Sequence, residues 1–147
     1  MSAESNVQAK VTREFACPAE RVYQAWLEPK SIGTWMFGPA VREEEVVALL
    51  TEAKVGGEFS FIVRRRGAKI SHVGRYLEME KPHRLVFTWG VKEHAGDNSR
   101  VAVVIEETAE GCVLTLTHEM PSQWADYVAK VEASWELMLA ALDKSLQ

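Results

Sequence analysis

The sequence predicts an α+β fold in which one curved antiparallel sheet of six to seven strands wraps around a long C-terminal helix. Two observations predict it. From residue 43 to residue 123, runs of β-branched and aromatic residues alternate with turn signals, as consecutive antiparallel strands do. After Pro121, the apolar residues recur with helical spacing instead. The 147 residues are 47% hydrophobic and 26% charged, which is a globular composition, so we expect residues 1–147 to form one domain.

The N-terminal part predicts a half-buried strand followed by two short helices. Apolar and polar residues alternate between Val7 and Phe15. Pro18 then stands at a favourable first helical position, and helical spacing continues until Pro29, which predicts a helix of about three turns. Pro29 can begin a second short helix, which Gly38-Pro39 ends.

The central part predicts six strands with one apolar face. The inward-facing residues of four of these strands are Phe59, Phe61 and Val63; Leu85, Phe87 and Trp89; Val101, Val103 and Ile105; and Leu114, Leu116 and His118. The residues between them are partly polar, so one sheet face is buried and the other is mostly in water. The segment from Ile70 to Met79 does not alternate cleanly, and Gly74 within it is a candidate bulge, so the facing of this segment stays open.

The C-terminal part predicts one amphipathic helix from about Ser122 to Ser145, with Ser122 as its N-cap. Its apolar stripe consists of Trp124, Tyr127 or Val128, Val131, Trp135, Met138, Leu142 and Leu146. A helix of about 24 residues is roughly 36 Å long, which is enough to cover the apolar face of the sheet.

Charge and motifs exclude several classes of function. The 17 basic and 21 acidic side chains give a net charge of −4, which lacks the basic surface that nucleic acids require. Cys17 and Cys112 have no CxxC spacing and no HExxH motif occurs, so we expect no metal and no cofactor. No apolar run approaches the roughly 20 residues of a membrane span, and the N-terminus lacks the layout of a signal peptide. These features indicate a cytoplasmic protein.

Two runs of like charge lie in the central part. Arg64-Arg65-Arg66 comes directly before Gly67 and indicates the solvated tip of a hairpin. Glu43-Glu44-Glu45 carries the opposite charge on the preceding predicted strand. The sequence leaves open whether the two runs pair.

Short motifs follow one another along the chain in a recognisable order and spacing. They are Pro18-Ala19-Glu20-Arg21-Val22, Ala25-Trp26, Pro29, Trp35, Gly56-Gly57-Glu58-Phe59, Gly74, Glu78, Pro82, Leu85, Thr88-Trp89, Leu114-Thr115-Leu116-Thr117-His118 and Trp135. From Val11 to Leu142 the chain thereby resembles the START-like (SRPBCC) superfamily, in the Aha-type branch of the activator of the heat-shock-protein-ninety ATPase. The resemblance implies a helix-grip fold with a ligand pocket between the long helix and the sheet. Ser134 departs from the branch, which often has glycine there, and this departure bears on the shape of the pocket.

Seven residues are candidates for lining that pocket: Trp35, Phe61, His72, Tyr76, Trp89, His118 and Trp135. Aromatic walls supply apolar contact, and a few polar groups orient a ligand. His118 is in phase with Leu116 and faces inward, either as a buried structural histidine or as the main polar group of the pocket. For the tryptophans, simple core packing is the alternative. No catalytic residue is predicted.

Three functions remain open. The first is binding of a small apolar or aromatic ligand, and the second, implied by the resemblance, is stimulation of a chaperone ATPase. The third is a cyclase-like enzyme with His118 as acid or base and Tyr76 or Arg75 as oxyanion partner. No nucleophile and base pair is visible, so we favour a binding protein. The sequence leaves the choice between monomer and homodimer open, because an edge strand can pair with that of a second copy.

Overall fold

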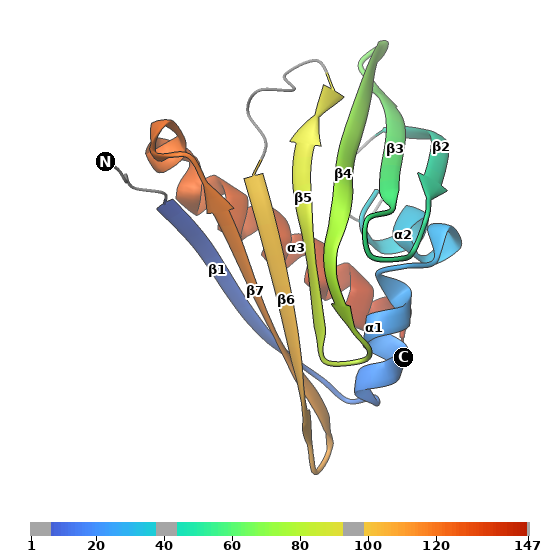
Figure 1. The fold of residues 1–147 in the computed structure, drawn as a ribbon, viewed down its shortest axis with the longest axis vertical. Helices are drawn as coiled ribbons and strands as arrows, with labels where there is room; N and C mark the ends of the chain where they lie inside the picture. The colour runs from blue at the N-terminus through green and yellow to red at the C-terminus, as the bar shows by residue number, and fades with distance from the viewer. Residues whose placement is uncertain (1–6, 38–43, 93–98, 147) are drawn as a thin grey trace.

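The computed structural model describes residues 7–37, 44–92 and 99–146, and these residues form one curved antiparallel sheet with a long helix across it (Figure 1). The elements in chain order are β1 (Val7–Phe15), α1 (Ala19–Ala25), α2 (Pro29–Trp35), β2 (Glu45–Thr51), β3 (Glu58–Arg65), β4 (Ala68–Glu80), β5 (Arg84–Val91), β6 (Ser99–Thr108), β7 (Gly111–Met120), the 3₁₀ helix η2 (Ser122–Tyr127) and α3 (Val128–Ser145). This arrangement confirms the predicted α+β helix-grip fold. Gly38-Pro39 and Glu43 lie outside the described residues.

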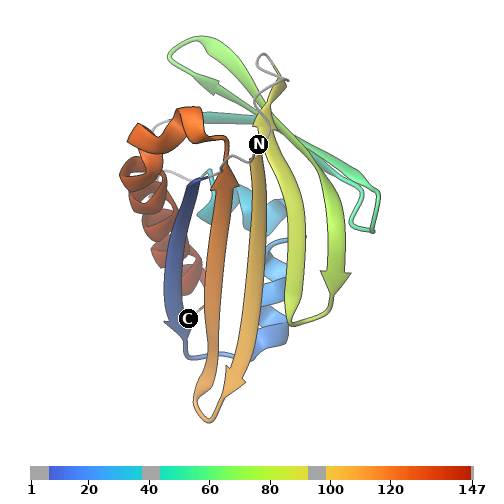
Figure 2. The same ribbon diagram turned by 60° about the vertical axis from the view of Figure 1, so that its left-hand side comes forward.

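The sheet has seven strands in the order β1-β7-β6-β5-β4-β3-β2. Neighbouring strands are consecutive in the chain except for β1 and β7, whose antiparallel pairing joins the first strand to the last. Seen from the side, the sheet curves around α3, with α1 and α2 over the same concave face (Figure 2). The first two strands of the chain, β1 and β2, are therefore the two edges of the sheet.

The two edges differ in how they are covered. The Lys10 backbone N–H of β1 donates a hydrogen bond to the Glu132 carboxylate of α3 at 2.9 Å, and Arg13 of β1 pairs with Asp143 of α3 at 3.0 Å. Strand β2 instead exposes apolar side chains, among them Val47 and Leu50, of which the latter is 59% exposed. The long helix thus contacts the β1 edge, whereas the β2 edge presents exposed apolar side chains.

The charged runs pair across β2 and β3, which the sequence alone had left open. Arg64 contacts Glu45 and Arg65 contacts Glu44, each at 2.8 Å. Arg66 and Gly67 form the tip of the β3–β4 hairpin, both with positive φ angles of 55° and 81°. Such angles are those of a two-residue turn whose twist matches that of the strands.

Strand β4 corrects the expectation of a bulge at Gly74. The register shift against β5 lies between Tyr76 and Glu78, at Leu77. Gly74 instead allows a close approach of its neighbours, because a Cβ atom there would overlap the Thr88 carbonyl oxygen and the ring of Phe59. The aromatic ring takes the place of the missing side chain.

The helices are shorter than predicted. The segment Ser122–Tyr127 is a 3₁₀ helix without a side-chain cap, and the α-helix begins only at Val128, so α3 has 18 residues and is about 27 Å long. In a 3₁₀ helix, residues three apart lie one above the other, which explains why the rings of Trp124 and Tyr127 contact each other at 5.3 Å. Helix α1 has seven residues rather than three full turns, and Pro18 precedes it as the N-cap.

Among the described residues, none of the helices combines the length and the apolar character that a membrane crossing needs.

The buried face of α3 consists of Trp135, Met138, Leu139 and Leu142. These four side chains pack against the concave face of the sheet.

The close approach at Gly74 predicts a large effect of adding one methyl group. We expect Gly74→Ala to lower the free energy of unfolding by about 3 kcal/mol, because the added methyl group overlaps backbone as well as the Phe59 ring. Gly67→Ala is the control: its positive φ angle costs about 1 kcal/mol, but no atom lies within 4 Å of the added carbon. Denaturant titration measures both values. Equal losses in the two variants would contradict the steric account.

Candidate functional site

The space between α3 and the sheet is filled by aromatic side chains. Trp26 stacks on Trp135 at 5.9 Å between ring centroids and meets the edge of Trp35 at 4.7 Å. Phe59 and Phe61 stack at 4.7 Å on the sheet side. What remains open among these rings is about 10 Å³, which is no more than a single water molecule needs. A ligand therefore finds no room in the middle of the concave face.

Open space lies instead at one end of the molecule, where β5 ends, β6 begins and β7 leads into η2. Two hollows of about 350 and 310 Å³ are present there. They share the side chains of Trp89, His118 and Trp124 and therefore adjoin. We call the two hollows together the mouth site. Its remaining lining residues are Gly90, Val91, Ser99 and Met120 in the first hollow, and His72, Tyr127, Lys130, Val131, Ser134, Trp135 and Met138 in the second.

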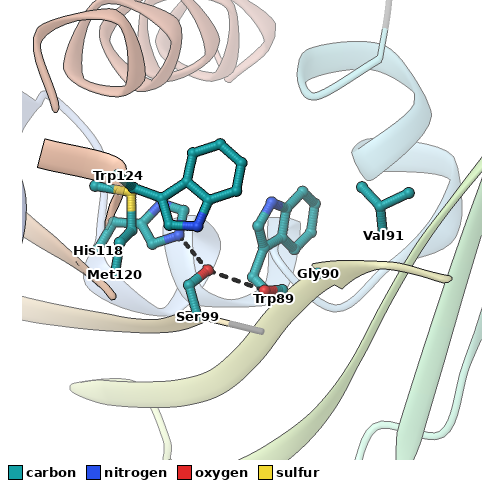
Figure 3. Close-up of a pocket in the computed structure, with 7 residues that line it drawn as sticks. All are labelled: Trp89, Gly90, Val91, Ser99, His118, Met120 and Trp124. Atoms are coloured by element: carbon teal, nitrogen blue, oxygen red, sulfur yellow. Dashed lines mark hydrogen bonds between the residues drawn. The ribbon is translucent and has the colours of Figure 1, made fainter. Parts of the chain in front are cut away.

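A chain of three hydrogen bonds forms the floor of the mouth site, and Figure 3 shows the two that Ser99 forms with His118 and Trp89. The Trp135 indole N–H donates to His118 Nδ1 at 3.0 Å, so Nδ1 carries no proton. The proton of the neutral ring is then on Nε2, which donates to Ser99 Oγ at 2.6 Å. The Ser99 hydroxyl in turn donates to the Trp89 carbonyl oxygen at 2.9 Å. Every bond in the chain thus has a defined direction.

The environment of His118 keeps its ring neutral. The side chain is only 5% exposed, and burial lowers the pKa of His118 to about 4. Protonation at Nδ1 would also replace the bond from Trp135 by two facing N–H groups. Both ring nitrogens are occupied by protein groups, so His118 presents no free polar atom to a ligand. This geometry favours the structural role among the two that the sequence left open.

The structure brings four of the seven candidate residues together at the mouth site: His72, Trp89, His118 and Trp135. The ring of His72 lies between those of Phe37 and Trp89, at 5.3 and 5.2 Å. This stack extends the aromatic wall from β5 onto β4.

The other three candidates lie away from the mouth site. Trp35 is fully buried, and its indole N–H donates to the Ala25 carbonyl oxygen at 3.0 Å. Phe61 and Tyr76 line the 10 Å³ space in the interior. The Tyr76 hydroxyl is 2.6 Å from Thr51 Oγ1, and Arg75 pairs with Glu58, so the oxyanion partners considered for His118 do not join it.

Sequence reasoning missed several lining residues. The helical spacing predicts Trp124, and Tyr127 or Val128, in an apolar stripe, whereas in η2 Trp124 is half-buried and Tyr127 is exposed. Ser99 and Lys130 carried no signal, because neither belongs to a motif. Ser134 was singled out as a departure from the resembling branch, and its side chain does line the second hollow.

Other hollows have a different chemical character. One of about 880 Å³ extends over β2 to β5, and its lining includes Glu52, Arg75 and Lys92. Another of about 450 Å³ adjoins Cys17 and Glu107. Both have more charged walls than the mouth site.

No metal centre is evident in the described part of the chain, where no three His, Cys, Asp or Glu side chains are grouped as ligands. Cys17 and Cys112 are free thiols. Burial raises the pKa of the Cys112 thiol to about 11, so this group is protonated at neutral pH.

Comparison with protein families gives one match over most of the chain. The family model described as "Activator of Hsp90 ATPase homolog 1-like protein" matches residues 16–147. Comparison with curated protein sequences gives no match.

Solved structures share the fold at low sequence identity. Protein CV1439 from Chromobacterium violaceum superimposes with a TM-score of 0.80 at 23% identity, over 93% of this chain and 94% of that one. A protein from Rhodobacter sphaeroides gives 0.82 at 20% identity, over 95% and 91% of the two chains. The protein of unknown function SA2116 from Staphylococcus aureus gives 0.81 at 15% identity, over 97% of both. Such likenesses establish the fold alone.

The low pKa of His118 predicts a loss of stability in acid. The folded pKa of about 4 lies below the ordinary 6.5, so the unfolded chain binds more protons between these two pH values. The contribution of the neutral His118 ring to the free energy of unfolding is present in full above pH 6.5 and is lost as the pH falls toward 4. Over this range, we expect the free energy of unfolding to fall by about 3 kcal/mol more in the wild type than in His118→Leu.

Denaturant titrations of both proteins at several pH values measure this difference. All other titrating groups are shared by the two proteins, so their contributions largely cancel. An equal pH dependence in wild type and variant would show that His118 titrates as an exposed histidine does.

Proposed function

Because the chain belongs to the family of Activator of Hsp90 ATPase homolog 1-like proteins, we propose that it binds a small apolar or aromatic molecule at the mouth site. The observation that carries this proposal is the pair of adjoining, aromatic-walled hollows beside a filled interior. Sites for small molecules typically have about 300 to 1,000 Å³, with mostly apolar walls and few polar groups. The hollows of about 350 and 310 Å³ fall in this range.

The filled interior favours a compact, flat ligand over a long flexible one. An acyl chain would have to displace rings that pack within 6 Å of one another, such as Trp26 and Trp135. A planar molecule of one or two fused rings instead fits beside Trp89 and Trp124, where offset or edge contacts between aromatic rings add about 0.5 to 1.5 kcal/mol per pair.

In this proposal, His118 positions the wall and does not bind the ligand. Its bonds to Trp135 and Ser99 fix two sides of the hollow. Trp89 and Trp124 provide the contact surface, since both line both hollows.

The chaperone-ATPase activity rests on the family description alone. A direct assay tests it: addition of this protein to a purified chaperone of the Hsp90 class would raise the rate of ATP hydrolysis. The cyclase-like alternative loses support from the geometry, since neither Arg75 nor Tyr76 lines the mouth site with His118.

Binding of a neutral planar probe tests the main proposal. We expect 2-naphthamide to bind the wild-type protein, and Trp124→Ala to weaken this binding about tenfold, because the substitution removes one aromatic wall. Isothermal titration calorimetry gives both dissociation constants. Native mass spectrometry of freshly purified protein would in addition detect a retained molecule.

Leu137→Ala is the matched control, since Leu137 is a large apolar side chain of α3 that is 47% exposed and does not line either hollow. Its affinity for the probe should equal that of the wild type. Wild-type affinity in Trp124→Ala would place binding elsewhere. The absence of any binding, with no retained molecule, would contradict the proposal.

A further inference from the structure

One wall of the mouth site is polar, and it belongs to α3. Lys130 and Ser134 both line the second hollow. They are four residues apart in a continuous α-helix, so their side chains are neighbours on one face, with about 5 to 6 Å between their Cβ atoms. The remaining walls of this hollow are largely aromatic or apolar.

Both groups are free to bind a ligand. Within the described ranges, Lys130 forms no ion pair and the Ser134 hydroxyl forms no hydrogen bond. By contrast, the polar atoms of His118 and Ser99 are engaged with each other and with Trp135 and Trp89. The ammonium and hydroxyl groups of α3 are therefore donors that the site can offer, and Lys130 is the one lysine or arginine in the described lining of the two hollows.

From this juxtaposition we propose that the mouth site selects a planar aromatic carboxylate, whose acid group lies between the Lys130 ammonium and the Ser134 hydroxyl. The inference rests on the proposed function, because the aromatic part of the ligand must occupy the mouth site. Both groups donate hydrogen bonds, and a carboxylate with two acceptor oxygens satisfies both at once. The positive charge of Lys130 matches the single negative charge of a carboxylate. The positive charge also disfavours a cationic ligand.

Ser134 gives this wall a feature that the resembling branch often lacks. Glycine at this position would supply no hydroxyl group and would leave the Lys130 ammonium as the free donor on this wall. The serine thus adds a second, directional contact one helical turn from the charge.

A pair of matched probes tests the inference. The 2-naphthoate anion and the neutral 2-naphthamide have the same ring system and nearly the same shape, so their affinity ratio isolates the charge. By calorimetry in low salt, we expect wild type to bind 2-naphthoate about tenfold more tightly. The preference should shrink as salt is added, since Lys130 is exposed and its charge is screened.

Two variants locate the preference. Lys130→Met keeps an apolar stem of similar length, and we expect it to lower the preference for 2-naphthoate to about threefold, which is the share that the Ser134 hydroxyl supplies. Ser134→Ala should lower the preference about threefold, because one hydrogen bond to the anion is lost. Binding of 2-naphthamide also shows that each variant is folded.

Lys144→Met is the control, since it removes an equal charge from the last turn of the same helix, outside both hollows. It should keep the wild-type preference. Equal binding of both probes by the wild type would overturn the anion selection and leave the proposed function standing. A preference of about tenfold that survives in Lys130→Met would also overturn it. Absence of binding by either probe would instead contradict the proposed function itself.

Discussion

The hydrogen bond from Trp135 to His118 determines where the long helix lies on the sheet. Trp135 is on α3, His118 on β7, Ser99 on β6 and Trp89 on β5, so three bonds join the helix to three adjacent strands. A buried polar group without a partner costs about 1 to 3 kcal/mol, so a shifted helix would leave both the indole N–H and the imidazole unsatisfied. Apolar packing tolerates sliding more readily than this chain of directed bonds does.

The position of the helix in turn decides where open space remains. With Trp135 held in place, its indole stacks on Trp26, and the rings of both helices and sheet close the middle of the concave face. Helix α3 also begins only at Val128, after the 3₁₀ helix η2. The hollows are thus a result of two features: a dense aromatic interior and a helix that begins late.

Periodicity in the sequence was sufficient for the strands, the sheet face and the presence of a C-terminal helix. It was not sufficient for three details. A 3₁₀ turn and an α-helix share the same short-range apolar spacing, so Ser122–Tyr127 could not be separated from α3. The phase of a strand gives the face of the sheet on which a residue lies but not how far it lies from the open end, so the sequence does not separate Phe61 and Tyr76 from Trp89. A glycine within a strand is a usual sign of a bulge. The sequence does not show that the Phe59 ring fills the space beside Gly74 where a side chain would lie.

The unequal edges of the sheet limit how copies of this chain can assemble. Association through strand edges needs an accessible row of backbone groups on each partner. Among the described residues, β1 has its Lys10 N–H taken by Glu132 of the covering helix, whereas β2 carries exposed valine and leucine side chains. A molecule with two accessible edges can add copies indefinitely and grow into a fibre, but one with a single accessible edge is used up by its first partner. The helix therefore hinders the addition of copies at the β1 edge, where the Lys10 N–H is already bonded, and the exposed valine and leucine side chains of β2 lie at the opposite edge.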